Sequence, residues 1–100
     1  MTLVRVALPA HLRTLAHVGS EVQVEVEGVA TVERLLDALE SRYPMLRGTI
    51  REHGNHKRRA YMRYYACGED ISHEPADAPL PEQIVTGDDV FIVLGAIAGG

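Results

Sequence analysis

The stretch EVQVEVEGVATVERLLDALESRYP, residues 21–44, contains the change of hydrophobic period that decides the fold. From Glu21 to Glu27, valines alternate with acidic or amide side chains, which predicts a strand with one buried face and one wet, acidic face. After Gly28 the apolar residues recur at helical spacing, as Val32, Leu35, Leu36, Leu39 and Tyr43. Thr31 is placed to cap this predicted helix, and Pro44 is placed to end it. We expect the helix to pack on the valine face of the strand.

Three further segments predict the other strands of the sheet. Leu3–Leu8 alternates between two faces, Tyr61–Cys67 is rich in aromatic residues, and Val90–Leu94 is a continuous apolar run typical of a central strand. The order strand, strand, helix, strand, strand allows the first and last strands to pair in parallel at the centre, beside an antiparallel first pair. We therefore expect an α+β protein with the β-grasp (ubiquitin-like) fold: a mixed four- to five-stranded sheet with one main helix packed on one face.

The remaining segments are interpreted as connections. We expect PAHLRTLAHVG, residues 9–19, to join the first two strands, and Met45–Ile50 to add a short helical turn. REHGNHKRR, residues 51–59, lacks periodicity and carries charge, glycine and asparagine, which predicts an exposed loop. Residues 1–95 then make up the β-grasp domain, and residues 96–100 a flexible C-terminal tail that ends in Gly-Gly.

The composition of the chain narrows the classes of function. The 100 residues are 46% hydrophobic and 24% charged, which is ordinary for one globular domain. The formal net charge of −4 argues against nucleic acid or an anionic membrane surface as the main partner. Cys67 is a lone cysteine that we expect in the core, the first residues do not read as a secretory signal, and no apolar run could span a bilayer. We therefore expect a cytoplasmic protein.

Several segments together carry a resemblance to a known family. They are the opening LVRVAL, VQVEVEG, the helical ATVERLLDALESRYP with the following MLR, YYACGED, TGDDVFIVL and the closing AGG. In this order and spacing the chain resembles the MoaD/ThiS family of ubiquitin-like sulfur-carrier proteins, which includes the molybdopterin synthase small subunit. The chain departs from the family pattern at Cys67-Gly68, where asparagine often precedes the glycine, and at Gly95-Ala96-Ile97, where members often carry prolines.

The resemblance implies a chemistry centred on the last two residues. An E1-like adenylyltransferase of the MoeB/ThiF type would use ATP to convert the Gly100 carboxylate to an acyl-adenylate, and a sulfur donor would then give a thiocarboxylate. Gly99 and Gly100 would thus form the reactive end of a carrier that is not itself an enzyme and binds no cofactor or metal. The sulfur would be used in cofactor biosynthesis, with molybdopterin as the favoured product and a MoaE-like large subunit as a further partner.

The residues themselves suggest how such a tail would work. Glycines lack a Cβ and can pass a narrow channel, and five extended residues would reach about 17 Å beyond the sheet. Ile97, followed by Ala98, could fix the register of the tail in a pocket of the partner. We also expect a docking surface on the uncovered sheet face, with Phe91 and Tyr65 as its aromatic residues, although both could equally complete the core.

Other functions remain open on the sequence alone. The chain could be a ubiquitin-like modifier that is conjugated to lysines, a sulfur carrier for thiamine, cysteine or another metabolite, or a plain binding module. His53 and His56 in HGNH suggest a metal, but the loop lacks the remaining ligands of a zinc site, so no metal is expected.

Overall fold

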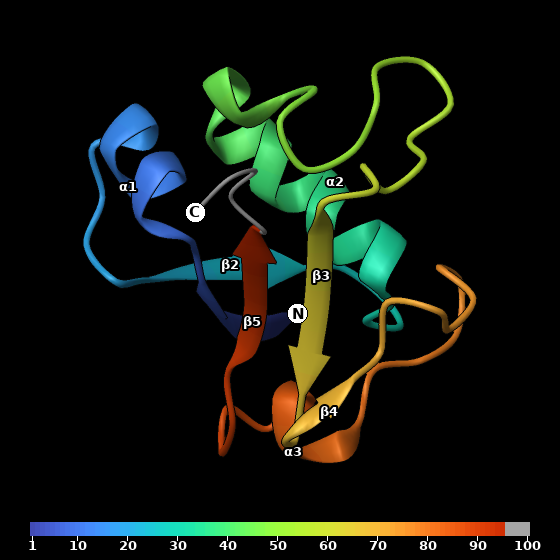
Figure 1. Cartoon of the computed structure of the whole chain (residues 1–100). Coiled ribbons are helices and arrows are strands. Elements are labelled where there is room, and N and C mark those ends of the chain that lie inside the picture. The colour runs from blue at the N-terminus through green and yellow to red at the C-terminus, as the bar shows by residue number, and fades with distance from the viewer. Residues whose placement is uncertain (96–100) are drawn as a thin grey trace.

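Five strands form one mixed sheet in the order β2-β1-β5-β3-β4 in the computed structural model, which describes residues 1–95. The strands are β1 (Thr2–Ala7), β2 (Glu21–Val26), β3 (Met62–Ala66), β4 (Glu69–Asp70) and β5 (Phe91–Gly95). Strand β1 pairs in parallel with β5, and the other three pairs are antiparallel. The expected parallel pairing of the first and last strands at the centre of the sheet is therefore confirmed, as is the β-grasp fold (Figure 1).

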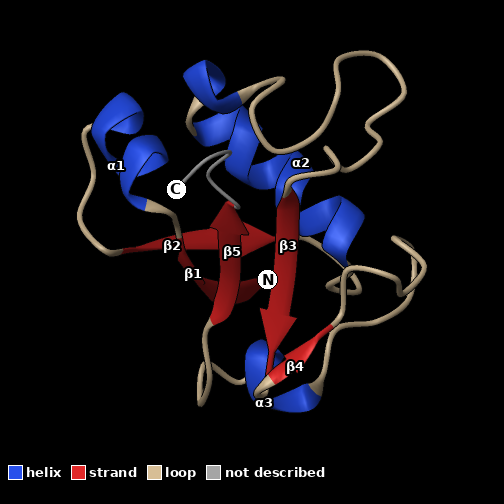
Figure 2. Cartoon of the chain, in the orientation of Figure 1, coloured by secondary structure: helices blue, strands red, loops and turns tan. Residues whose placement is uncertain are grey.

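The main helix, α2 (Val32–Arg42), covers one face of the sheet, as Figure 2 shows. Its leucines Leu35, Leu36 and Leu39 are fully buried against the inward-facing valines of β1 and β2. Each such side chain contributes roughly 1.5–3 kcal/mol to folding, so this layer is a major source of stability. Thr31 caps the helix by accepting a hydrogen bond from the Arg34 N–H at 3.1 Å, and the short helix η1 (Pro44–Leu46) follows directly. Both ends match the sequence prediction.

A second helix, α1 (Ala10–Ala16), occupies the segment that we expected to be a plain connection. Pro9 stands at its N-cap, and Leu12 and Ala16 face the core at a spacing of four residues. His17 ends it in the left-handed conformation, with φ of 57°. The segment joins the first two strands as expected. The sequence does not indicate the helix within it, because a single apolar pair one turn apart is enough to bury so short a helix against the core.

Two other connections also contain ordered core residues. Arg51, expected in an exposed loop, is only 4% exposed, although residues 53–57 beyond it are exposed as predicted. The connection between β4 and β5 contains the one-turn helix α3 (Glu82–Val85), which buries Ile84, and the nearby Leu80 is also buried. The connections therefore close both ends of the core.

Cys67 lies on the surface instead of in the core. Together with Gly68 it forms the two-residue turn between β3 and β4, with φ of 54° and 78° respectively. Two successive positive φ values are the geometry of a type I′ hairpin turn, which turns the Cys67 side chain away from the strand's buried face. The expectation of a buried thiol was wrong because the strand ends one residue earlier, at Ala66.

Candidate functional site

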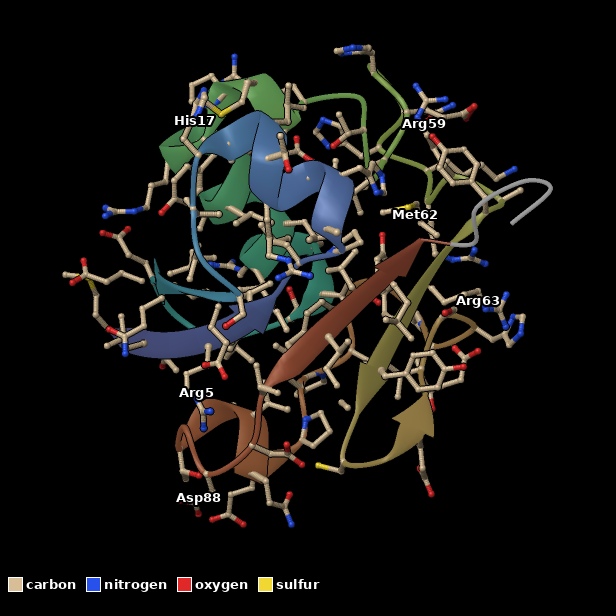
Figure 3. All side chains as sticks on the ribbon, turned by 60° about the vertical axis from the view of Figure 1, so that its left-hand side comes forward. Arg5, His17, Arg59, Met62, Arg63 and Asp88 are labelled. Carbon is tan, nitrogen blue, oxygen red and sulfur yellow. The ribbon has the colours of Figure 1, made fainter. Side chains whose placement is uncertain are left out.

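The candidate site begins where β5 ends, at Gly95. Gly95 pairs with Met62 of β3, and Figure 3 shows Met62 beside the end of β5. A Cβ built on Gly95 would lie 3.1 Å from Cε1 of His11 on α1 and 3.3 Å from Sδ of Met62. Both distances are tighter than ordinary contacts, so glycine lets the chain pass between α1 and β3 as it leaves the sheet.

The predicted tail follows directly after this passage. All five residues of this tail lie outside the residues that the structure describes: Ala96, Ile97, Ala98, Gly99 and Gly100. The described residues show where that segment starts, which is at the end of the central strand β5.

The outer face of the sheet, opposite α2, carries an apolar strip next to this point. Ile92 and Leu94 point outward from β5, and Tyr65 lies directly across from Ile92 on β3. Leu94 is 46% exposed, Tyr61 at the start of the β3 segment is 48% exposed, and Tyr65 is half-buried. We call Tyr61, Tyr65, Ile92 and Leu94 the outer strip; the structure places Tyr65 on the face where the sequence predicts it.

Phe91 does not belong to the outer strip. It is fully buried, and its ring centroid lies 5.6 Å from that of Tyr64 in the core. The alternation along β5 is therefore the opposite of the predicted one: Phe91 and Val93 face inward, and Ile92 and Leu94 face outward. The expectation that Phe91 presents an aromatic docking surface is wrong, because a run apolar on both faces leaves its phase undetermined.

Two ion pairs lie on this face of the sheet, and one of them stands within the strip, because Arg63 lies directly across from Leu94 and between Tyr61 and Tyr65. Arg63 on β3 bonds Asp70 on β4 at 2.7 Å, and Arg5 on β1 bonds Glu21 on β2 at 2.9 Å. Figure 3 shows the two arginines on opposite sides of β5. Hydrogen bonds from Ser72, and then the Arg63 guanidinium, hold the pKa of Asp70 well below its usual range. Both ion pairs are thus charged at neutral pH, and a surface that combines apolar and aromatic side chains with arginine is a common form of protein-binding surface.

The described residues offer little chemistry of their own. Desolvation by neighbouring atoms, together with the nearby Asp89 carboxylate, raises the pKa of the exposed Cys67 thiol, which disfavours the reactive thiolate. Within residues 1–95 no three His, Cys, Asp or Glu side chains are arranged to hold a metal ion. No helix among those same residues has the length and apolar character needed to cross a bilayer.

Sequence reasoning missed His11 as a part of the site. The missing element was α1, which carries His11 to the end of β5. The signal was present in the apolar pair Leu12 and Ala16 following Pro9, but seven residues are too few for a clear helical period.

This geometry defines a ubiquitin-like protein of the β-grasp fold, whose central strand leads into the C-terminal segment. Comparison with solved structures agrees: the chain is similar to SAMP1 from Haloferax volcanii (23% identity, 98% of this chain and 99% of that one, TM-score 0.75). It is also similar to a chain of the Amycolatopsis orientalis BexX/CysO complex (26% identity, 97% of this chain and 99% of that one, TM-score 0.72). A third similar structure is the small archaeal modifier protein 1 from Methanosarcina acetivorans (26% identity, 100% of this chain and 98% of that one, TM-score 0.69).

These structural neighbours confirm the resemblance to the ubiquitin-like sulfur-carrier family that the sequence indicates. No protein-family model and no curated protein sequence matches the chain.

Proposed function

We propose that this chain is a sulfur carrier that acts through the carboxylate of Gly100. A partner enzyme of the E1-like, MoeB/ThiF type joins this carboxylate to AMP from ATP, with release of pyrophosphate. A sulfur donor then displaces AMP, and the resulting thiocarboxylate donates its sulfur in cofactor biosynthesis. In this scheme Gly99 and Gly100 enter the partner's active site, and Ile97 and Ala98 fix the register of the tail.

One observation carries the proposal: the central strand β5 leads directly into AIAGG. Strand β5 pairs with β1 through Phe91 and Ile92 and with β3 from Ile92 to Gly95, so the segment after it starts from a residue that is held in the sheet. Gly95 has no side chain, so the start of that segment fits between His11 and Met62. A carrier needs these features, because a partner enzyme must reach the reacting carboxyl group without unfolding the domain.

The outer strip would provide the docking surface for the activating enzyme. Its residues lie beside the end of β5, so a partner that covers them is also positioned to receive the segment that follows. The solved complex of BexX with CysO, a structural neighbour, supports a partner protein for this chain.

The experiment combines the chain with ATP, an E1-like enzyme and sulfide, which displaces AMP directly, followed by intact mass measurement. The expected result is the mass increase of one oxygen replaced by one sulfur, located at Gly100 by fragmentation. A variant that lacks Gly99 and Gly100 should show no exchange and should unfold at the same temperature. Exchange in this variant, or none in the full chain, would refute the proposal.

A second candidate function is conjugation to lysines, which the likeness to small archaeal modifier protein 1 favours. The activation step would be the same, but a lysine amine would attack the Gly100 acyl group. Trypsin would leave residues 64–100 on such a lysine, since Arg63 is the last lysine or arginine in the sequence. The variant Ala98→Arg shortens this remnant to Gly-Gly. Diglycine-modified lysines in cells expressing the variant would support a modifier. Their absence, in cells where the variant still forms the thiocarboxylate, would leave only the carrier function.

The pathway served is a further part of the proposal. We favour molybdopterin, in which case the chain forms a stable complex with a MoaE-like large subunit. A carrier for thiamine, cysteine or another metabolite would form no such complex. Co-purification of the tagged chain with a MoaE-like protein from the same organism separates these possibilities.

A further inference from the structure

A cavity lined by both polar and apolar side chains lies on the inner side of the sheet, away from the outer strip. Its volume is about 440 Å³, and it lies between the first turn of α2, the segment 55–58 and the segment 72–76. Figure 1 shows both segments beyond the same edge of the sheet, next to β3. A volume of this size is within the range of small-molecule sites, which span about 300–1,000 Å³. Asn55, His56, Lys57 and Glu74 on its wall are exposed, so solvent reaches it.

The hydroxyl of Tyr64 is the unusual group in this cavity. Tyr64 lines the cavity and is only 5% exposed, yet its hydroxyl has no hydrogen-bond partner among residues 1–95. A buried hydroxyl without a partner costs roughly 1–3 kcal/mol, and such groups are rare in native proteins. Burial raises the pKa of Tyr64 to about 12, so at neutral pH the hydroxyl can donate a hydrogen bond.

Charged side chains of both signs surround this donor. Arg51, Lys57 and Arg58 line the cavity, against the two carboxylates of Glu33 and Glu74. Arg51 is already held by Asp37 and Glu40, each at 2.9 Å, so its position is fixed. Arg58 donates to the Met62 carbonyl at 2.7 Å, which holds its guanidinium beside β3. With Arg51 paired to two carboxylates, Arg58 and Lys57 are the cations of this wall that have no carboxylate ion pair among residues 1–95.

We propose that this cavity is a binding site for a small molecule that carries an oxyanion group, a phosphate or a carboxylate. An oxyanion offers the acceptor that the Tyr64 hydroxyl lacks, and its charge complements Arg58 and Lys57. The site is independent of the carrier function, since it lies on the opposite face of the sheet from the outer strip. A bound ligand would join the segments 55–58 and 72–76.

The test is a titration of the full chain with inorganic phosphate and, separately, acetate, followed by backbone amide NMR and thermal unfolding. Potassium chloride at matched ionic strength is the reference. We expect saturable shifts at the amides of Arg58 and Ser72 and a rise in the unfolding temperature with at least one of the two anions. The more effective anion identifies the group that the ligand carries. No shift beyond that in chloride with either anion would overturn the proposal.

A matched pair of variants locates the effect. Tyr64→Phe should weaken anion affinity about tenfold or more, because a hydrogen bond to a charged group is lost. Tyr65→Phe, one residue along and on the opposite face of β3, should bind as the unmodified chain does. In chloride alone Tyr64→Phe should be at least as stable as the unmodified chain.

Arg58→Gln provides a second, independent variant and should also weaken binding about tenfold or more. Equal affinity in Tyr64→Phe, Arg58→Gln and the unmodified chain would show that the anions bind elsewhere and would overturn the assignment.

Discussion

Nε of Arg51 lies 2.9 Å from Oε2 of Glu40, and both side chains are buried. The same guanidinium bonds Asp37 through Nη2, also at 2.9 Å. Burial disfavours the charged form of Arg51, but the hydrogen bonds that Arg51 donates to Glu40 and Asp37 outweigh this effect and leave the pKa of Arg51 raised. These two contacts hold the segment after η1 against the C-terminal half of α2.

Replacement of Arg51 by methionine should lower the free energy of unfolding by about 3–5 kcal/mol, because Glu40 is left buried without its cation. Urea unfolding followed by circular dichroism measures the change. The double variant Arg51→Met, Glu40→Leu should recover most of the loss, since no unpaired buried charge remains. Arg5→Met, at the exposed pair with Glu21, serves as the control and should cost much less. Equal losses for the two arginines would contradict this account.

Replacement of Leu94 by alanine should slow activation by the E1-like enzyme about tenfold at low carrier concentration, because an apolar contact of the outer strip is lost. Leu3→Ala is the matched control: Leu3 is 47% exposed and Leu94 46%, but Leu3 lies at the start of β1, far along the sheet from the end of β5. The rate of thiocarboxylate formation measures both. If Leu3→Ala slowed activation as much as Leu94→Ala, the outer strip would not be the docking surface.

Replacement of Gly95 by alanine should destabilise the domain, because the new Cβ meets His11 and Met62. Met62 is fully buried and cannot move aside easily, whereas His11 is exposed and can. The cost should therefore fall by about 0.5–1 kcal/mol in a His11→Ala background, as expected for two residues in contact. Thermal unfolding of the four-member cycle measures this coupling, and strict additivity would show that His11 does not contact residue 95.

Acid stability should depend on Asp70. Because the native pKa of Asp70 is lowered from its ordinary value of 3.8, the unfolded chain binds a proton more readily than the folded one. The contribution of Asp70 is therefore present above about pH 4 and is lost as the pH falls toward the native pKa. Asp70→Asn should show a shallower loss of stability below about pH 4, measured as the urea midpoint against pH. Ser72→Ala should be intermediate, since the backbone bond from residue 72 remains.

The sequence predicts the layers of this fold because two of its segments have unambiguous periods. The valine alternation in 21–27 and the leucine spacing in 32–43 each assign one face, and the structure buries those faces. Val90–Leu94 is apolar throughout, so the sequence places it at the centre of the sheet but cannot orient it, and Phe91 was assigned to the wrong face.

The candidate site was less predictable for a different reason. His11 reaches Gly95, and Arg51 reaches Glu40, only through packing between segments that are distant in the sequence. Neither residue carries a local pattern: His11 lies on a helix of seven residues, and Arg51 begins a charged segment that otherwise faces solvent. Such partners are found from coordinates.

The pairing of β5 on both sides also has a mechanical consequence. An enzyme that draws the end of the chain into its active site pulls along the axis of β5, and the force falls on the pairing of Ile92 to Gly95 with β3 and, further along the strand, on the pairing of Phe91 and Ile92 with β1. These hydrogen bonds are perpendicular to the direction of the force. They are therefore loaded in shear, and several must break together before the strand can move. The domain can thus withstand traction on its tail while the partner works.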